Sequence, residues 1–291
     1  MIRSFIPWLA CAFLTLAHAA PAPPAFEGII IQPDGANRRV FIVTATKASI
    51  RYREEKDATE IKDRKLSELK SVFLTEPPAL SAALDLFQGR RYQEAKIAFA
   101  EIKTLYQPVA TLPDNPATLA AFYELECFRK LSDLDGLWEA LKKFDKDPLV
   151  RENHLRQIEM YVFWDAVRTK NWNRLIALAK DREKQRLPDY QRAQVAYCQA
   201  LALEALGKPS EALEAYDIAL TADSGASEEI ARKSAIAILK ILSADPDVKE
   251  ALKKPDGKHP KLAEARAVAG LFELSLGSGE ALPEEYRVFL K

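Results

Sequence analysis

The spacing of apolar residues changes near residue 77. Before it, short runs of β-branched residues alternate with polar turns, a pattern that predicts strands. The runs cover 28–32, 40–44, 48–53 and 59–62. From Leu80 to Lys291 apolar residues recur at helical spacing instead. The sequence therefore predicts a mainly α chain that begins with a small β module.

The predicted β module covers 28–76 and ends at Pro77-Pro78, after Leu66, Leu69, Val72 and Leu74. Three to five short strands in about fifty residues fit either an SH3-like barrel or a sheet packed on the first helices. A module of this size buries little surface by itself. We therefore expect it to dock onto the helical part.

The helical part divides into pairs with short connections. The predicted pairs are 80–87 with 92–105, 119–131 with 136–144, 154–169 with 172–183, and 190–206 with 209–220. Further helices are predicted at 227–242, 247–253, 262–276 and 283–289. Prolines 108, 113 and 116 interrupt the helices between the first two pairs.

The pair around Gly207 has the clearest packing pattern. Ala212 and Ala219 lie seven residues apart on one helix face, with Tyr216 between them, so small residues sit where the two helix backbones would cross. Together with Leu203 and Leu206 in the first helix, this segment resembles a tetratricopeptide repeat (TPR).

Equivalents of Ala212 occur at Ala95, Leu137 and Leu175, so the four positions are separated by 42, 38 and 37 residues. The equivalents of Ala219 are Ile102, Phe144 and Arg182, so the signature is strong in one copy and weak in three. The resemblance implies a TPR-like α-solenoid of antiparallel helix pairs over 77–226, followed by a C-terminal helical cap over 227–291.

In TPR proteins the first helices line a concave groove that binds a partner peptide or helix. Carried onto this chain, the inner positions include Gln157, Gln194 and a ladder of aromatic residues with charged neighbours. The candidate groove residues are Tyr123, Glu126, Arg129, Lys130, Tyr161, Trp164, Arg168, Tyr197 and Glu204. Aromatic rings beside guanidinium groups suit a peptide that carries carboxylates.

The N-terminus has the features of a secretory signal peptide. Arg3 precedes an apolar run over 5–16, and Ala17-His18-Ala19 is a cleavage pattern. We expect a signal peptide over 1–19, a flexible Pro-rich leader over 20–27, and a mature protein in the periplasm, the outer cell envelope or the medium. Lipidation at Cys11 is a less favoured alternative. Membrane association is expected only through a partner or through this lipidation.

The net charge bears on the class of partner, and the cysteine content bears on disulfide formation. Without 1–19 the chain has 41 basic and 42 acidic side chains, a net charge of −1, which does not favour nucleic acid as a partner. Cys127 and Cys198 lie in different predicted repeats, and we expect two buried thiols rather than a disulfide.

Catalytic and metal-binding patterns are weak. The 67–70 segment matches S-x-x-K, but the motifs that accompany it in penicillin-binding proteins are missing. Asp133, Asp135 and Gly136 resemble part of a calcium loop, yet its final glutamate position is Phe144, so a capped turn is the better interpretation. We expect no enzyme activity, cofactor or metal.

The leading hypothesis is thus a non-enzymatic protein-protein interaction scaffold in the cell envelope. The alternative is a carbohydrate-binding or glycan-processing envelope protein whose groove aromatics stack on sugar rings. A third possibility is self-association through exposed repeat faces. The sequence does not identify the partner, the pathway or the oligomeric state.

Overall fold

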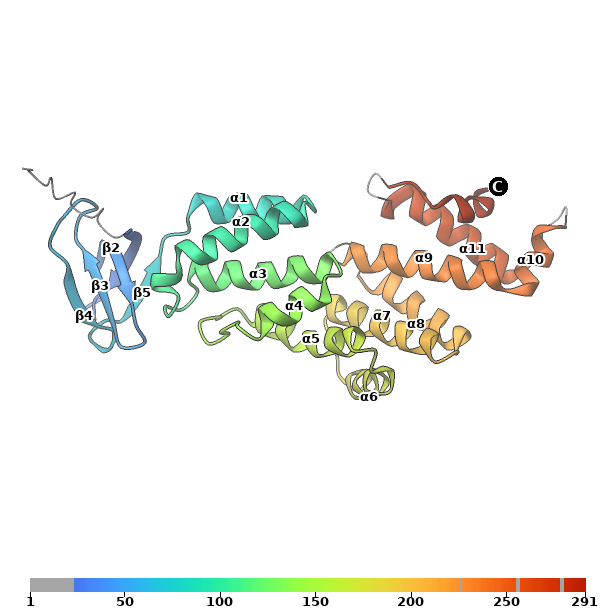
Figure 1. Cartoon of the computed structure of the whole chain (residues 1–291), viewed down its shortest axis with the longest axis horizontal. Coiled ribbons are helices and arrows are strands. Elements are labelled where there is room, and N and C mark those ends of the chain that lie inside the picture. Colours follow the sequence, from blue (N-terminus) through green and yellow to red (C-terminus); the bar gives the residue numbers. More distant parts are fainter. Residues whose placement is uncertain (1–23, 224, 226, 255–256, 278–279) are drawn as a thin grey trace, which may run out of the picture.

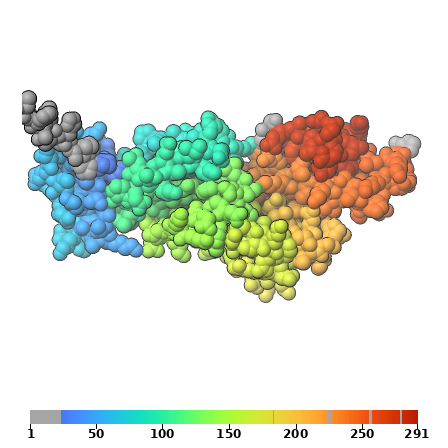
Figure 2. Space-filling view, in the orientation of Figure 1, coloured from blue at the N-terminus to red at the C-terminus, as the bar shows by residue number. Residues whose placement is uncertain are grey.

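The computed structural model describes residues 24–223, 225, 227–254, 257–277 and 280–291. The predicted signal peptide and Cys11 lie outside these residues, as does the first half of the leader, 20–23. The molecule is elongated, with a β-sheet at one end and the C-terminal helices at the other (Figures 1 and 2). The prediction of a mainly α chain with a small N-terminal β module is confirmed.

The sheet is antiparallel, with strand order β4-β3-β2-β1-β5. Its strands are β1 (Phe26–Ile31), β2 (Asn37–Ala45), β3 (Ser49–Arg53), β4 (Lys62–Lys65) and β5 (Ser71–Leu74). In this order β4 and β5 are the edge strands of a small antiparallel sheet. The fourth strand begins where the predicted one ended, and β5 was not recognised as a strand.

Gly28 permits the close approach of β1 to β5. A Cβ atom on this residue would lie 2.6 Å from the carbonyl oxygen of Phe73. The core of the sheet contains Ile30, Val40, Ile42 and Ile50, all fully buried.

The sheet docks onto the segment that follows α2. Val109 and Leu112 from that segment are buried in the sheet's apolar core. The Thr44 hydroxyl donates a hydrogen bond to the Pro108 carbonyl at 3.2 Å, and the rings of Phe26 and Tyr106 lie 4.5 Å apart. Apolar residues of the helical part therefore complete the core of the β module, which is too small to bury enough apolar surface by itself.

The helices follow the predicted periodicity closely. They are α1 (Pro78–Gln88), α2 (Tyr92–Leu105), α3 (Pro116–Lys130), α4 (Leu134–Leu141), α5 (Glu152–Arg168), α6 (Trp172–Glu183), α7 (Asp189–Ala205), α8 (Pro209–Ala222), α9 (Glu228–Ala244), α10 (Pro246–Leu252) and α11 (Pro260–Leu271). The predicted helix over 262–276 becomes a π-helix at Phe272–Leu276, and the last predicted helix is a 3-10 helix at Glu284–Leu290.

Four of the helix-to-helix turns have the same backbone geometry. Arg90, Ser132, Lys170 and Gly207 have φ values of 62°, 60°, 52° and 75°. In each turn the next backbone N–H bonds the carbonyl five residues earlier, which is the Schellman ending of a helix. The bonds are Arg91 to Leu86, Asp133 to Phe128, Asn171 to Ala166 and Lys208 to Leu203, at 2.9, 3.0, 2.9 and 2.9 Å.

The residue five positions after each of these turns is buried in the helix that follows. These residues are Ala95, Leu137, Leu175 and Ala212, at most 3% exposed. They are the positions that the sequence pattern aligned, so one packing position recurs in four consecutive hairpins.

Two connections are fixed by side chains that cap the helix after them. Asp133 caps α4 by accepting a hydrogen bond from the Gly136 N–H at 2.9 Å, so the segment that resembled a calcium loop is a capped turn. Asn115 caps α3 and donates to the carbonyls of Ala110 and Leu112. The Asn115 side chain thereby fixes the long connection between α2 and α3, where the sheet docks.

Candidate partner-binding site

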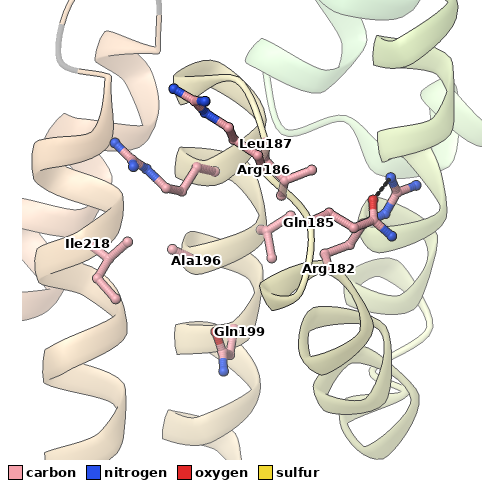
Figure 3. Close-up of a pocket in the computed structure, with 9 residues that line it drawn as sticks. Arg182, Gln185, Arg186, Leu187, Ala196, Gln199 and Ile218 are labelled. Carbon is pink, nitrogen blue, oxygen red and sulfur yellow. Dashed lines mark hydrogen bonds between the residues drawn. The ribbon is translucent and has the colours of Figure 1, made fainter.

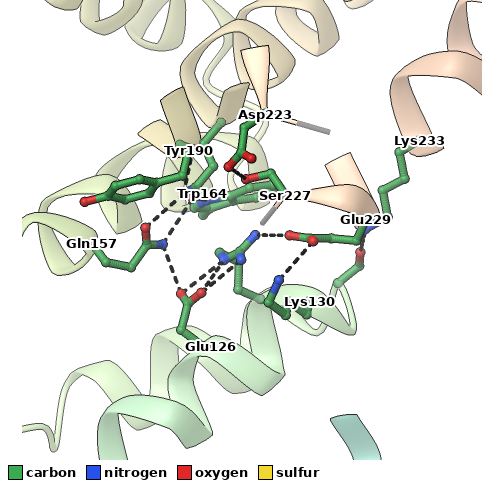
Figure 4. Close-up of polar contacts among 12 residues, drawn as sticks. Glu126, Lys130, Gln157, Trp164, Tyr190, Asp223, Ser227, Glu229 and Lys233 are labelled. Atoms are coloured by element: carbon green, nitrogen blue, oxygen red, sulfur yellow. Dashed lines mark hydrogen bonds and ion pairs between the residues drawn. The ribbon is translucent and has the colours of Figure 1, made fainter. Parts of the chain in front are cut away.

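A cluster of buried polar side chains lies where α3, α5, α7 and α9 meet (Figure 4). At its centre, Glu126 and Arg129 form an ion pair within one turn of α3, with 2.9 Å between Arg129 Nη2 and Glu126 Oε2. Their side chains are 10% and 4% exposed. Charges at this depth require partners for their remaining hydrogen-bonding atoms.

Amide and aromatic side chains supply some of those partners. Gln157 of α5 and Gln194 of α7 exchange two hydrogen bonds, at 3.1 and 2.9 Å. Gln157 Nε2 and the Tyr161 hydroxyl both donate to Glu126 Oε1, and Trp164 Nε1 donates to Gln194 Oε1. One polar network therefore fixes the lateral positions of α3, α5 and α7.

Glu229 connects this network to α9. It accepts from Arg129 Nη1 at 2.8 Å and from Lys130 Nζ at 2.9 Å. Figure 1 shows α3 ending where α9 begins. The basic residues occupy the last turn of α3 and the acidic residue the first turn of α9, so each charge is also favoured by the dipole of its own helix.

The network holds its charges at neutral pH. Burial by itself raises the pKa of both carboxyl groups, but Arg129 and Lys130 outweigh it. The pKa of Glu229 falls to about 2 and that of Glu126 is also lowered. Burial alone would lower the pKa of Arg129, yet Glu126 and Glu229 raise it above its ordinary value.

A cavity of about 250 Å³ opens beside the network. Its lining comes from α1, α3, α5, α7 and the residue that precedes α9, so it crosses the first helix of each hairpin in turn. The lining residues are Phe87, Phe122, Tyr123, Glu126, Arg129, Lys130, Asn153, His154, Gln157, Tyr190, Gln194 and Ser227. This volume accommodates one large side chain of a bound segment.

His154 belongs to the cavity wall. It is 4% exposed and stacks on Phe122, with 4.2 Å between ring centroids. Burial, helped by Arg151, lowers its pKa, so the ring is neutral at pH 7. Its Nδ1 atom has no hydrogen-bond partner among the described residues. Such a buried atom is satisfied by water or by a ligand.

The structure divides the predicted groove residues among four places. Glu126, Arg129, Lys130, Tyr161 and Trp164 belong to the buried network. Tyr123 lies in the cavity wall.

The other three lie elsewhere. Tyr197 and Glu204 line a second hollow of about 430 Å³, beside α9. Arg168, at the end of α5, pairs with Asp165 and Asp135 and lies over the Trp138 ring.

The aromatic ladder is mostly internal. Tyr161 and Trp164 are 2% and 4% exposed, so their ring faces pack against neighbouring helices and are not available to a ligand. Tyr123 and Tyr190 are partly exposed and offer the accessible aromatic surface of the cavity. The alternative of sugar rings stacking on Tyr161 and Trp164 loses its structural basis.

Sequence reasoning missed several residues of the site. Glu229 looked like an ordinary acidic residue at a helix start, and nothing in the sequence relates it to Arg129, one hundred positions earlier. Tyr190, Asn153 and Phe87 lie at helix ends, outside the positions that repeat alignment selects. The repeat alignment had placed Gln157 and Gln194 at inner positions, although they were not among the candidate groove residues.

Other kinds of site were sought in the part of the chain that the structure describes. There, no three His, Cys, Asp or Glu side chains gather as metal ligands would. None of the helices described has both the length and the apolar character needed to cross a bilayer. Cys127 and Cys198 are buried free thiols.

Comparison with known proteins identifies no relative: no protein-family model, no curated protein and no solved structure matches the chain.

Proposed function

We propose that the chain is an exported, non-enzymatic interaction scaffold of TPR-like hairpins that binds a peptide or helix of a protein partner in the cavity beside Tyr123 and Tyr190. One observation carries the proposal. Successive first helices, α1, α3, α5 and α7, contribute to the lining of a single cavity. This is the arrangement by which stacked helix pairs form a recognition surface.

The recurring turns support the repeat architecture. Each of the four hairpins has a turn residue with positive φ, a hydrogen bond that closes the turn, and a buried residue five positions after the turn residue. A helix pair with a single apolar face needs neighbours to cover it, so such pairs stack.

The ionised state of Glu126, the one carboxylate among the lining residues described, argues against a general acid at this cavity. Glu126 is ion-paired and its pKa is lowered, so it holds no proton at neutral pH. A general acid needs a raised pKa close to the working pH. The cavity therefore offers recognition, with aromatic surface from Tyr123 and Tyr190.

The test is affinity capture from envelope extract with the mature chain, 20–291, followed by titration of the recovered partner. Truncating Tyr190 or Tyr123 to Ala should weaken binding at least tenfold, because aromatic side chains in partly desolvated pockets are binding hot spots. Trp138→Ala is the matched control, since that aromatic side chain lies on α4 outside the cavity lining.

Equal recovery of the partner by Tyr190→Ala and Tyr123→Ala would refute the cavity as the binding site. Export has a separate test, the N-terminal residue of the protein purified from the envelope, which should be Ala20.

A further inference from the structure

Another hollow, of about 360 Å³, lies between α6 and α8 and uses α7 as its floor (Figure 3). Its lining residues are Arg182, Gln185, Arg186, Leu187, Arg192, Val195, Ala196, Gln199 and Ile218. This outer hollow shares no residue with the cavity of the proposed function.

The two sites use opposite faces of α7. Tyr190 and Gln194 line the cavity, whereas Arg192, Val195 and Ala196 face the outer hollow. At about 100° per residue, the mean directions of these two stripes differ by roughly 180°. Occupation of one site therefore leaves the other open.

The floor of the outer hollow has the spacing of a helix contact. Arg192, Val195, Ala196 and Gln199 stand at positions i, i+3, i+4 and i+7 of α7, the stripe that one helix presents to another. Ile218 on α8 is 49% exposed and stands at the rim. This is a slot with a helical floor, α8 on one side, and the end of α6 with the loop that follows it on the other.

The charged residues that line the slot are all basic. Three arginines line it, and no Asp or Glu is among the lining residues. Arg182 pairs with Glu159 at 3.3 Å and Arg192 with Asp189 at 3.0 Å. Arg186 makes no ion pair with any side chain that the structure describes, and its guanidinium is exposed at the mouth of the slot.

We infer that the outer hollow docks an acidic amphipathic helix of a second partner protein. The apolar stripe of that helix covers Leu187, Val195 and Ile218, and a carboxylate next to the stripe meets Arg186. A guanidinium presents a fork of donors that a carboxylate can accept in pairs. With both sites in use, the chain would join two partners.

The experiment is a selection of displayed random 16-residue peptides on the full mature chain. Each selected peptide is synthesised and titrated against the unaltered protein, Ile218→Asp, Arg186→Glu and Tyr190→Ala. Both outer-hollow positions are exposed, so equal thermal melting of their variants and the parent verifies folding.

The inference predicts a class of peptides with net negative charge and apolar residues at i, i+3 or i+4, and i+7. This class should bind at least tenfold more weakly to Ile218→Asp and to Arg186→Glu, become weaker as salt rises, and be indifferent to Tyr190→Ala. Conversion of its acidic residues to Lys should abolish binding.

Three results would overturn the inference: no peptide sensitive to Ile218→Asp, a sensitive class without acidic residues, or a fatty acid such as laurate that competes for the slot while no peptide does. Peptides that respond only to Tyr190→Ala would support the proposed function and refute this second site. The two proposals can therefore fail independently.

Discussion

The ion pair between α3 and α9 is the sharpest test of how this molecule is held together. In Glu229→Gln the side chain keeps its size but loses its charge, so Arg129 and Lys130 remain buried with Glu126 as their one acidic partner in the network. The fall of the Glu229 pKa from 4.5 to about 2 corresponds to about 3 kcal/mol of stabilisation. Removal of one partner from a buried ion pair costs about 3–5 kcal/mol, which agrees with that figure.

The measurement is urea unfolding of Glu229→Gln beside a control with the same charge change. In Glu139→Gln the altered side chain is 63% exposed and pairs with Lys142 on the surface of α4. Surface pairs contribute about 0–1 kcal/mol, so the control should unfold almost as the parent does. Hydrogen exchange should also accelerate in the first turn of α9 of Glu229→Gln, where the contact with α3 is lost.

Equal unfolding midpoints for the two variants would refute the reasoning. A loss of stability in Glu229→Gln without faster hydrogen exchange at the start of α9 would also contradict it. The stabilisation by Glu229 would then not act through contact between α3 and α9. Lys130→Met in the Glu229→Gln background should recover part of the loss, since it removes one of the uncompensated cations.

Three further predictions concern single groups. Because the folded pKa of Glu229 is lowered, its contribution of about 3 kcal/mol to stability is present above pH 4.5 and should be lost as the pH falls through about 2. Unfolding measured at graded acid pH can follow this loss, which Glu229→Gln should not show. Gly207→Ala should lower the free energy of unfolding by about 1 kcal/mol, because Gly207 has a φ of 75°. Gly270→Ala inside α11, where the added Cβ also has open space, should raise it by up to about 1 kcal/mol. Urea midpoints of the two variants that shift in the same direction would contradict this. Burial raises the pKa of Cys127 to about 12, so it should react with a thiol reagent at pH 8 only in denaturant, and rapid labelling of the native protein would disprove its burial.

Local sequence rules placed most of the elements. Tyr92–Leu105 and Trp172–Glu183 match their predicted bounds because apolar spacing and turn residues delimit them. The failures have local reasons. The strand Ser71–Leu74 is only four residues long, with one buried side chain, so it shows little alternation. The π-helix at Phe272–Leu276 continues an apolar helical pattern that does not distinguish α from π geometry.

Part of the candidate site was predicted from the sequence, because the repeat alignment assigned Glu126, Gln157 and Gln194 to inner positions of the first helices. The sequence did not predict whether a residue at an inner position is exposed to solvent. Tyr161 and Trp164 occupy inner positions, yet the neighbouring helices cover them, so their polar atoms serve the network instead of a ligand.

The sequence by itself determined the hairpins, since helix periodicity and turn chemistry act over a few residues and do not depend on the rest of the chain. Tertiary structure decided how the hairpins meet. It brought Glu229 to Arg129 across one hundred residues, turned opposite faces of α7 toward two separate hollows, and set the sheet on the loop after α2. These outcomes depend on helix crossing angles and on which side chains exclude one another, and such properties exist only when all the helices are present together.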